Sequence, residues 1–93
     1  MVIGFLSLEI YIPYSHSLKE KRKRLSGLKN RLKNKYNVAL AELDYHKKWQ
    51  RTKIGMVTIN NEKKLVDSLF NKIIEDAEQN IDGHIIEHQI HYF

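Results

Sequence analysis

The sequence predicts an α+β fold of the ferredoxin-like, split-βαβ type (βαββαβ): a four-stranded antiparallel sheet with two helices on one face. Two amphipathic helical segments alternate with segments of strand-like pattern, and no long linker or repeat interrupts them. A chain of 93 residues with 42% hydrophobic content has room for one core, so we expect a single ferredoxin-like domain over residues 1–93. Right-handed crossovers then place both helices on the same face of the sheet.

The first strand and the first helix have the clearest patterns. Apolar residues and Gly4 occupy the even positions from 2 to 12, which is the period of a strand with one buried face. Ser17 and Glu20 form a capping-box pattern, so a helix is expected to begin there. The apolar stripe of this helix consists of Leu18, Leu25, Leu28, Leu32 and Tyr36. Lys21 projects into this stripe, and we expect its ammonium group to reach water beyond the edge of the core.

The second strand is expected over residues 37–45. The face that this strand turns to the core is predicted from the free-energy cost of burial, because an unpaired carboxylate inside a core is unfavourable. Glu42 and Asp44 are therefore expected to face outward. The residues expected to face inward are Ala39, Ala41, Leu43 and Tyr45.

The second half of the chain supplies two more strands and a helix. A third strand is expected from Trp49 or Gln50 to residue 59, followed by a helix capped by Asn60 or Asn61. The apolar face of that helix consists of Leu65, Val66, Leu69, Phe70, Ile73, Ile74 and Ala77. Gly83 fits a stop beyond the helix, and residues 84–93 form the last strand.

One face of the predicted sheet has no helix to cover it. The side chains expected on this open face are Ile3, Phe5, Tyr11, Val38 and Leu40. They amount to more apolar surface than a sheet face normally exposes to water. We therefore expect another surface to cover part of it, and a homodimer through this face is one hypothesis.

Positive charge is concentrated in the first helix. Residues 19–35 contain nine of the sixteen Lys and Arg residues and a single acid, which gives this segment a net charge of +8 against −3 elsewhere. The candidate RNA- or partner-binding residues in it are Lys19, Arg22, Lys23, Arg24, Lys29, Arg31, Lys33 and Lys35. An array of one sign on a helix is typical of phosphate binding through counterion release. The alternative is a Lys-rich composition that places ammonium groups on any solvated face.

Trp49, Gln50 and Arg51 form a second candidate site, next to Lys47 and Lys48. A tryptophan can stack on a base, and an arginine can bind a phosphate through its guanidinium fork. The alternative interpretation is structural, with the tryptophan plugging the end of the core.

The sequence does not predict catalysis, a cofactor or a metal. Glu42, Asp44 and His46 recur at every second residue, but no further ligand or nucleophile completes a site. His84 and His88 would lie about 13 Å apart along a strand. The absence of cysteine excludes thiolate chemistry and disulfides. No apolar run reaches the roughly 18 residues of a membrane span, so we expect a cytoplasmic protein.

Three segments resemble the bacterial YlxP-like family: Ser17-Leu-Lys-Glu-Lys-Arg22, Tyr36-Asn-Val-Ala-Leu-Ala-Glu-Leu-Asp44 and Trp49-Gln-Arg51. The resemblance extends over nearly the whole chain and implies a small cytoplasmic protein with a ferredoxin-like fold and no established activity. Many members are encoded near translation initiation factor two and ribosome-binding factor A, which implies a role in ribosome maturation or translation.

Two hypotheses for the function result from these observations. The first is a noncatalytic binding protein for rRNA or the small ribosomal subunit. The alternative is a homodimeric interaction module whose basic helix docks an acidic protein.

Overall fold

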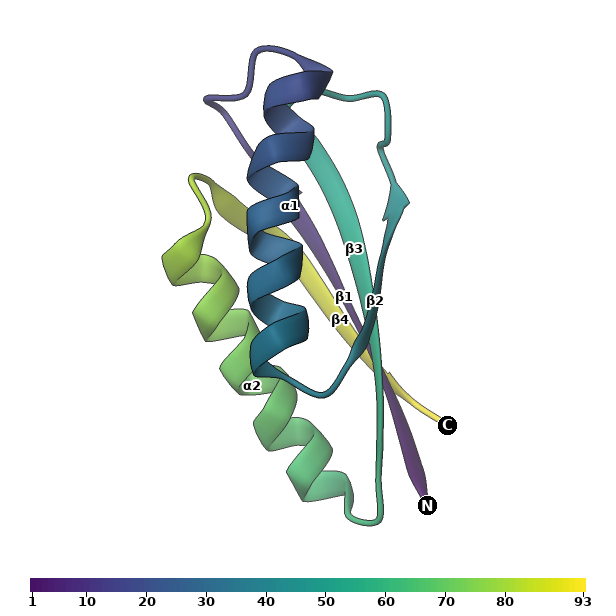
Figure 1. Cartoon of the computed structure of the whole chain (residues 1–93). Helices are drawn as coiled ribbons and strands as arrows, with labels where there is room; N and C mark the ends of the chain where they lie inside the picture. Colours follow the sequence, from purple (N-terminus) through teal and green to yellow (C-terminus); the bar gives the residue numbers. More distant parts are fainter.

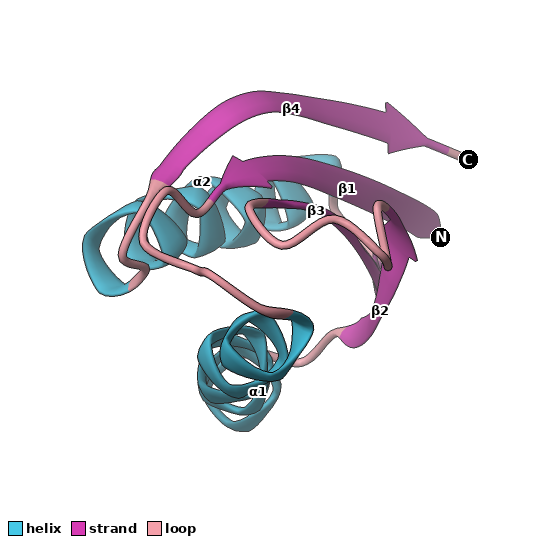
Figure 2. Cartoon of the chain, turned by 90° about the horizontal axis from the view of Figure 1, so that it is seen from above, coloured by secondary structure: helices cyan, strands magenta, loops and turns pink.

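The computed structural model describes all residues from 1 to 93. Its elements are β1 (Val2–Tyr11), α1 (Leu18–Lys35), β2 (Ala39–Asp44), β3 (Arg51–Asn60), α2 (Lys63–Asn80) and β4 (His84–Tyr92). The strands form one antiparallel sheet in the order β2-β3-β1-β4, and both helices lie on the same face (Figures 1 and 2). The predicted ferredoxin-like fold is confirmed. Neither helix is long and apolar enough to cross a membrane.

The core lies between the sheet and the two helices. Thirteen buried hydrophobic residues form one cluster, to which β1 contributes the alternate residues Leu6, Leu8 and Ile10. Gly4 continues this row without a side chain, because a Cβ there would overlap Val66 and Phe70. The glycine therefore lets α2 approach the central strand closely.

The ends of α1 and α2 are capped in different ways. The Ser17 hydroxyl accepts the Glu20 N–H at 3.1 Å, as predicted, and the Glu20 carboxylate accepts the N–H of His16. Asn60 does not cap α2 itself. Its side chain accepts the N–H of Glu62, the residue before the helix, at 3.2 Å.

Gly83 serves the return from α2 to the sheet. The helix ends where the Ile81 N–H donates to the Ala77 carbonyl at 3.1 Å. A Cβ on Gly83 would overlap the backbone carbonyl of Tyr11. The glycine thus allows β4 to begin directly against the end of β1.

The orientation of β2 is opposite to the prediction. Leu40 is paired with the buried Met56 and packs against the core, and so does Val38. Glu42 faces α1, whereas Ala39, Ala41 and Leu43 are exposed. Asp44, which follows a register shift, is exposed as predicted. The expectations that Glu42 faces outward and that Val38 and Leu40 belong to the open face are therefore wrong. The prediction assumed that a buried Glu42 would have no partner, but Lys21 of α1 lies against its carboxylate.

The open face of the sheet has an apolar end. The residues Ile3, Phe5, Ala39, Ala41, Leu43, Val57 and Ile59 are called the apolar end; they lie on β1, β2 and β3 between the level of Gly55 and that of Ile59. A Cβ on Gly55 would meet the side chains of Leu43 and Phe5, so these two lie across the glycine. The Phe5 ring also stacks on His91 of β4, with ring centroids 6.3 Å apart. Part of this face is thus covered by its own side chains.

Candidate functional site

The cations of α1 fall on two sides of the helix, and those facing α2 are paired. Arg24 lies 2.7 Å from a carboxylate oxygen of Asp82, just beyond α2. Arg31 Nε lies 2.6 Å from one oxygen of Asp76, and Lys35 Nζ lies 2.9 Å from the other. These three predicted RNA-binding residues therefore already have anionic partners.

Asp76 is the centre of this contact between the helices. Its buried carboxylate accepts hydrogen bonds from Arg31, Lys35, the Tyr36 hydroxyl and the Asn80 amide. Burial alone would raise the pKa of Asp76, but the hydrogen bonds from Arg31, Lys35 and Tyr36 outweigh it and hold that pKa well below its ordinary value. The carboxylate stays charged and fastens α1 to α2.

The remaining exposed side of α1 carries unpaired cations. Five cations of α1 make no ion pair in the structure, and we call them the basic row: Lys19, Arg22, Lys23, Lys29 and Lys33. At 100° per residue they fall within an arc of about 120° on the flank away from α2, and they extend over about 21 Å of helix. None of the five makes an ion pair with an acid, so the row presents unpaired positive charge along this flank of α1.

Lys21, the ninth cation, is inside the protein. Its side chain is among the most buried, with the residue 1% exposed, and its Nζ donates to the Tyr45 carbonyl and lies 3.3 Å from Glu42 Oε2. The expectation that this ammonium reaches water is wrong, because Glu42 of β2 and the Tyr45 carbonyl just beyond β2 supply it with two acceptors. Burial raises the pKa of Glu42, but hydrogen bonds from Thr52 and Lys21 outweigh it, and the net pKa is lowered.

Tyr45 has a backbone conformation that fixes the loop after β2. It is the only residue other than glycine with a positive φ, at 64°, a conformation that is uncommon for a bulky side chain. Its carbonyl accepts both the Lys21 ammonium and, at 3.0 Å, the N–H of Lys48. The buried lysine therefore holds the turn from which the following loop residues project.

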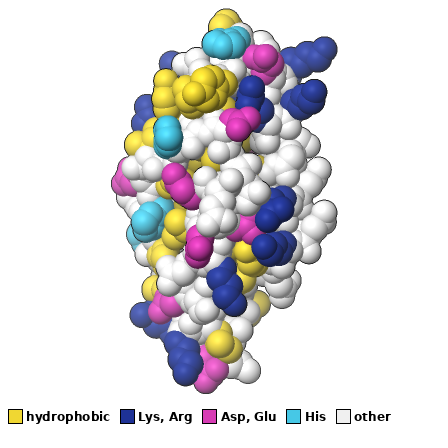
Figure 3. Space-filling model, turned by 90° about the vertical axis from the view of Figure 1, so that its left-hand side faces the viewer, with side chains coloured by type: hydrophobic (Ala, Val, Ile, Leu, Met, Phe, Trp, Pro, Cys, Tyr) yellow, Lys and Arg dark blue, Asp and Glu magenta, His cyan; other side chains and the backbone are white.

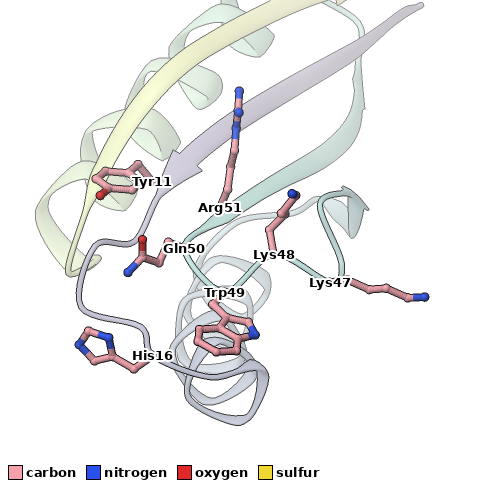
Figure 4. Close-up of a pocket in the computed structure, with 7 residues that line it drawn as sticks. All are labelled: Tyr11, His16, Lys47, Lys48, Trp49, Gln50 and Arg51. Atoms are coloured by element: carbon pink, nitrogen blue, oxygen red, sulfur yellow. The ribbon is translucent and has the colours of Figure 1, made fainter.

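This loop and the end of β1 enclose an open hollow of about 610 Å³ (Figure 4). It is lined by Tyr11, His16, Lys47, Lys48, Trp49, Gln50 and Arg51. Trp49 is 53% exposed, so the interpretation of it as a plug over the core is wrong. The structure thus brings the predicted Trp49-Gln50-Arg51 segment together with two lysines and the start of α1.

Arg51 forms a fixed wall of this hollow. Its guanidinium lies 2.5 Å from a Glu9 carboxylate oxygen and 4.5 Å above the Tyr45 ring, and the Tyr45 hydroxyl donates to Glu9 at 3.2 Å. The hydrogen bond from Arg51 lowers the pKa of Glu9, so this pair stays charged. The unpaired cations of the hollow are instead Lys47 and Lys48.

The three residues considered for acid–base chemistry do not form one site. Glu42 faces α1, and a register shift separates it from the exposed Asp44. His46 Nε2 lies 3.9 Å from Glu42 Oε1. No group of three or more His, Asp or Glu side chains is placed to hold a metal ion, the three histidines of β4 included.

Residues 3–90 match the family described as "Protein of unknown function (DUF503)". The chain belongs to this family. One relative is the uncharacterized protein YlxP of Bacillus subtilis (strain 168), 33% identical over 73 residues that cover 78% of this chain and 79% of the relative. The resemblance to YlxP-like proteins is therefore confirmed.

A solved structure similar to this DUF503 chain is the de novo designed protein Ferredog-Diesel. The TM-score is 0.52 with 14% sequence identity, and the match covers 96% of this chain and 83% of the designed one. At this identity the likeness concerns the fold only.

Sequence reasoning missed two buried ions of this DUF503 protein, although both leave a signal. Lys21 lies in the apolar stripe of α1, and Asp76 lies in that of α2, between Ile73 and Ala77. A charged residue inside an apolar stripe indicates a partner on a neighbouring element. Which element supplies that partner depends on the tertiary arrangement.

Proposed function

We propose that this protein is a noncatalytic RNA-binding protein that acts on rRNA of the small ribosomal subunit through the basic row of α1. The observation that carries the proposal is the row itself: five cations on one flank of a rigid helix without an acidic partner. Such an array binds phosphates by releasing condensed counterions, independently of base sequence. The gene neighbourhood of YlxP-like proteins supports ribosome maturation or translation as the setting.

The distribution of acids favours this proposal over a merely solvated Lys-rich helix. On the side of the molecule that carries α2, acidic and basic side chains are interspersed, as Figure 3 shows. The cations of α1 that face α2 have carboxylate partners, whereas those of the basic row have none. A composition bias alone would leave both flanks equally unpaired.

The test removes equal charge from two surfaces. Arg22→Gln with Lys33→Gln takes two cations from the basic row, and Lys64→Gln with Lys72→Gln takes two exposed, unpaired cations from α2 as the matched control. Labelled small-subunit rRNA fragments are titrated at several salt concentrations and followed by fluorescence anisotropy. We expect the first pair to reduce the slope of log K against log salt by about 1 to 2, and the control pair to leave it nearly unchanged. Equal effects of both pairs would contradict the proposal.

A second function is favoured by the open face. Leu43, Val57 and Ile59 of the apolar end are 45%, 41% and 58% exposed. Val57 and Ile59 line a shallow hollow of about 370 Å³ together with Ile3 and Ala39, whereas Leu43 lies beside Gly55. A homodimer through this end is the second candidate, with an acidic protein on the basic row if RNA does not bind there.

A further inference from the structure

We propose that the hollow beside Trp49 holds a single unpaired nucleobase of the RNA whose phosphates lie along the basic row. This inference rests on the proposed function and specifies its ligand: an RNA stem with an unpaired nucleotide next to it. Four features of the hollow support it: its charge, its aromatic surface, its hydrogen-bonding groups and its position.

The charge of the hollow selects an anionic ligand. None of the residues that line it is acidic, and Lys47 and Lys48 have no carboxylate partner. Its volume of about 610 Å³ lies within the usual range of ligand pockets, roughly 300–1,000 Å³. A nucleotide combines the required negative charge with a flat group that fits an open pocket.

Trp49 supplies the surface for that flat group. Its indole is more than half exposed, makes no hydrogen bond within the protein and lies against an open volume rather than the core. Figure 4 shows Gln50 and His16 on one side of the indole and Lys47 and Lys48 on the other. A base stacked on this ring would have its edge toward the first pair and its phosphate toward the second.

Gln50 presents a fixed acceptor to the edge of the base. Its amide nitrogen donates to the Pro13 carbonyl at 3.0 Å, and its backbone carbonyl accepts the Ile12 N–H at 2.8 Å. Because a carbonyl can only accept, the Gln50 amide has one orientation, which leaves Oε1 free. This oxygen suits a base that carries an amino group, such as adenine.

The loop that carries these groups is held in place before RNA binds. The Tyr45 carbonyl accepts the Lys21 ammonium and the Lys48 N–H, which fixes the turn preceding Trp49. A fixed loop loses less conformational freedom on binding than a mobile one. The loop between β2 and β3 lies near the first turns of α1 (Figure 1), where Lys19, Arg22 and Lys23 begin the basic row. The phosphates of an RNA stem can therefore contact the basic row while one flanking base reaches the hollow.

The experiment uses Trp49 as its own reporter, since it is the only tryptophan in the chain. An RNA hairpin with a single bulged adenosine is compared with the same hairpin fully paired. We expect the bulged RNA to quench Trp49 fluorescence and to bind roughly 5- to 150-fold more tightly, the range for one base stacked on an aromatic ring. Anisotropy of labelled RNA then shows Trp49→Ala removing this preference and Trp49→Phe retaining most of it.

The controls separate this inference from the proposed function. Trp49→Ala should leave the affinity for the paired hairpin and the thermal midpoint unchanged, while Arg22→Gln with Lys33→Gln should weaken both RNAs. Equal binding of the two hairpins, with only the basic-row variant affected, would overturn the inference and leave the proposed function standing. No binding of either RNA would overturn both. Free AMP is the last control. If it quenched Trp49 fluorescence at the same concentration as the bulged hairpin does, the inference would also be overturned, because the hollow would then bind a free nucleotide.

Discussion

Lys21 and Glu42 form a charge pair that crosses the core between α1 and β2. Both groups lose most of their contact with water, and each is satisfied by a second partner, the Tyr45 carbonyl for Lys21 and the Thr52 hydroxyl for Glu42. A buried pair of this kind contributes little net stability compared with apolar residues of the same size. Removing only one of the two charges lowers the stability strongly, because the other charge then remains buried without a partner.

This argument makes a prediction for Lys21→Met. The substitution keeps the apolar part of the side chain but leaves the Glu42 carboxylate without its ammonium, so we expect the free energy of unfolding to fall by about 3–5 kcal/mol. The double variant Lys21→Met with Glu42→Met should recover most of that loss. Urea unfolding at neutral pH measures both, with the exposed Lys33→Met as control. If Lys21→Met lowered the free energy of unfolding no more than the control does, the Lys21 ammonium would have to lie in water.

The contact between α1 and α2 depends on one carboxylate in a similar way. Asp76 receives hydrogen bonds from Arg31, Lys35 and Tyr36 on α1 or at its end. These hydrogen bonds lower the pKa of Asp76 in the folded protein below its value of 3.8 in the unfolded chain. A lowered pKa means that the contribution to stability is complete above the unfolded value and is lost as the pH falls below about 4.

We therefore expect the stability of the wild type to decrease on acidification more steeply than that of Asp76→Asn. The variant keeps the shape and one acceptor but loses the charge, which should cost about 2 kcal/mol at pH 7. Urea unfolding between about pH 7 and pH 2 measures the difference between the two proteins. Because Glu9 and Glu42 also have lowered pKa values and are present in both, the difference isolates Asp76. A difference independent of pH would refute the assignment.

The elements that the sequence predicts well are those fixed by local patterns. The period of two in β1 and the Ser17–Glu20 capping box are properties of neighbouring residues, and the structure contains both. The orientation of β2 is not local, because the cost of burying Glu42 depends on Lys21 in another element. The basic row is a similar case: its charge is visible in the sequence, but its separation from the paired cations depends on where α2 places Asp76 and Asp82.

In the whole molecule, the basic row and the apolar end lie on opposite sides of the sheet. The row belongs to the helix layer, whereas Phe5, Leu43 and Val57 belong to the face without helices (Figure 2). Self-association through the apolar end would therefore leave the basic rows of both copies exposed. RNA binding and dimerisation are compatible, and a dimer would present two rows to one RNA.

Val57 is the residue with which to test this arrangement, since it is paired with Phe5 on one side and Ala39 on the other, within the apolar end. We expect light scattering at high micromolar concentration to show a dimer for the wild type and a monomer for Val57→Glu, because a buried unpaired carboxylate opposes association. The matched control is Ile86→Glu, a similarly exposed apolar residue of β4 outside the apolar end, which should remain dimeric. In both variants, each chain should bind a short RNA through its basic row as tightly as the wild type does. Only Val57→Glu should bind a long RNA more weakly, because a monomer cannot place two linked basic rows on the same RNA. A strictly monomeric wild type would eliminate the dimer and leave the basic row as the interaction surface to study.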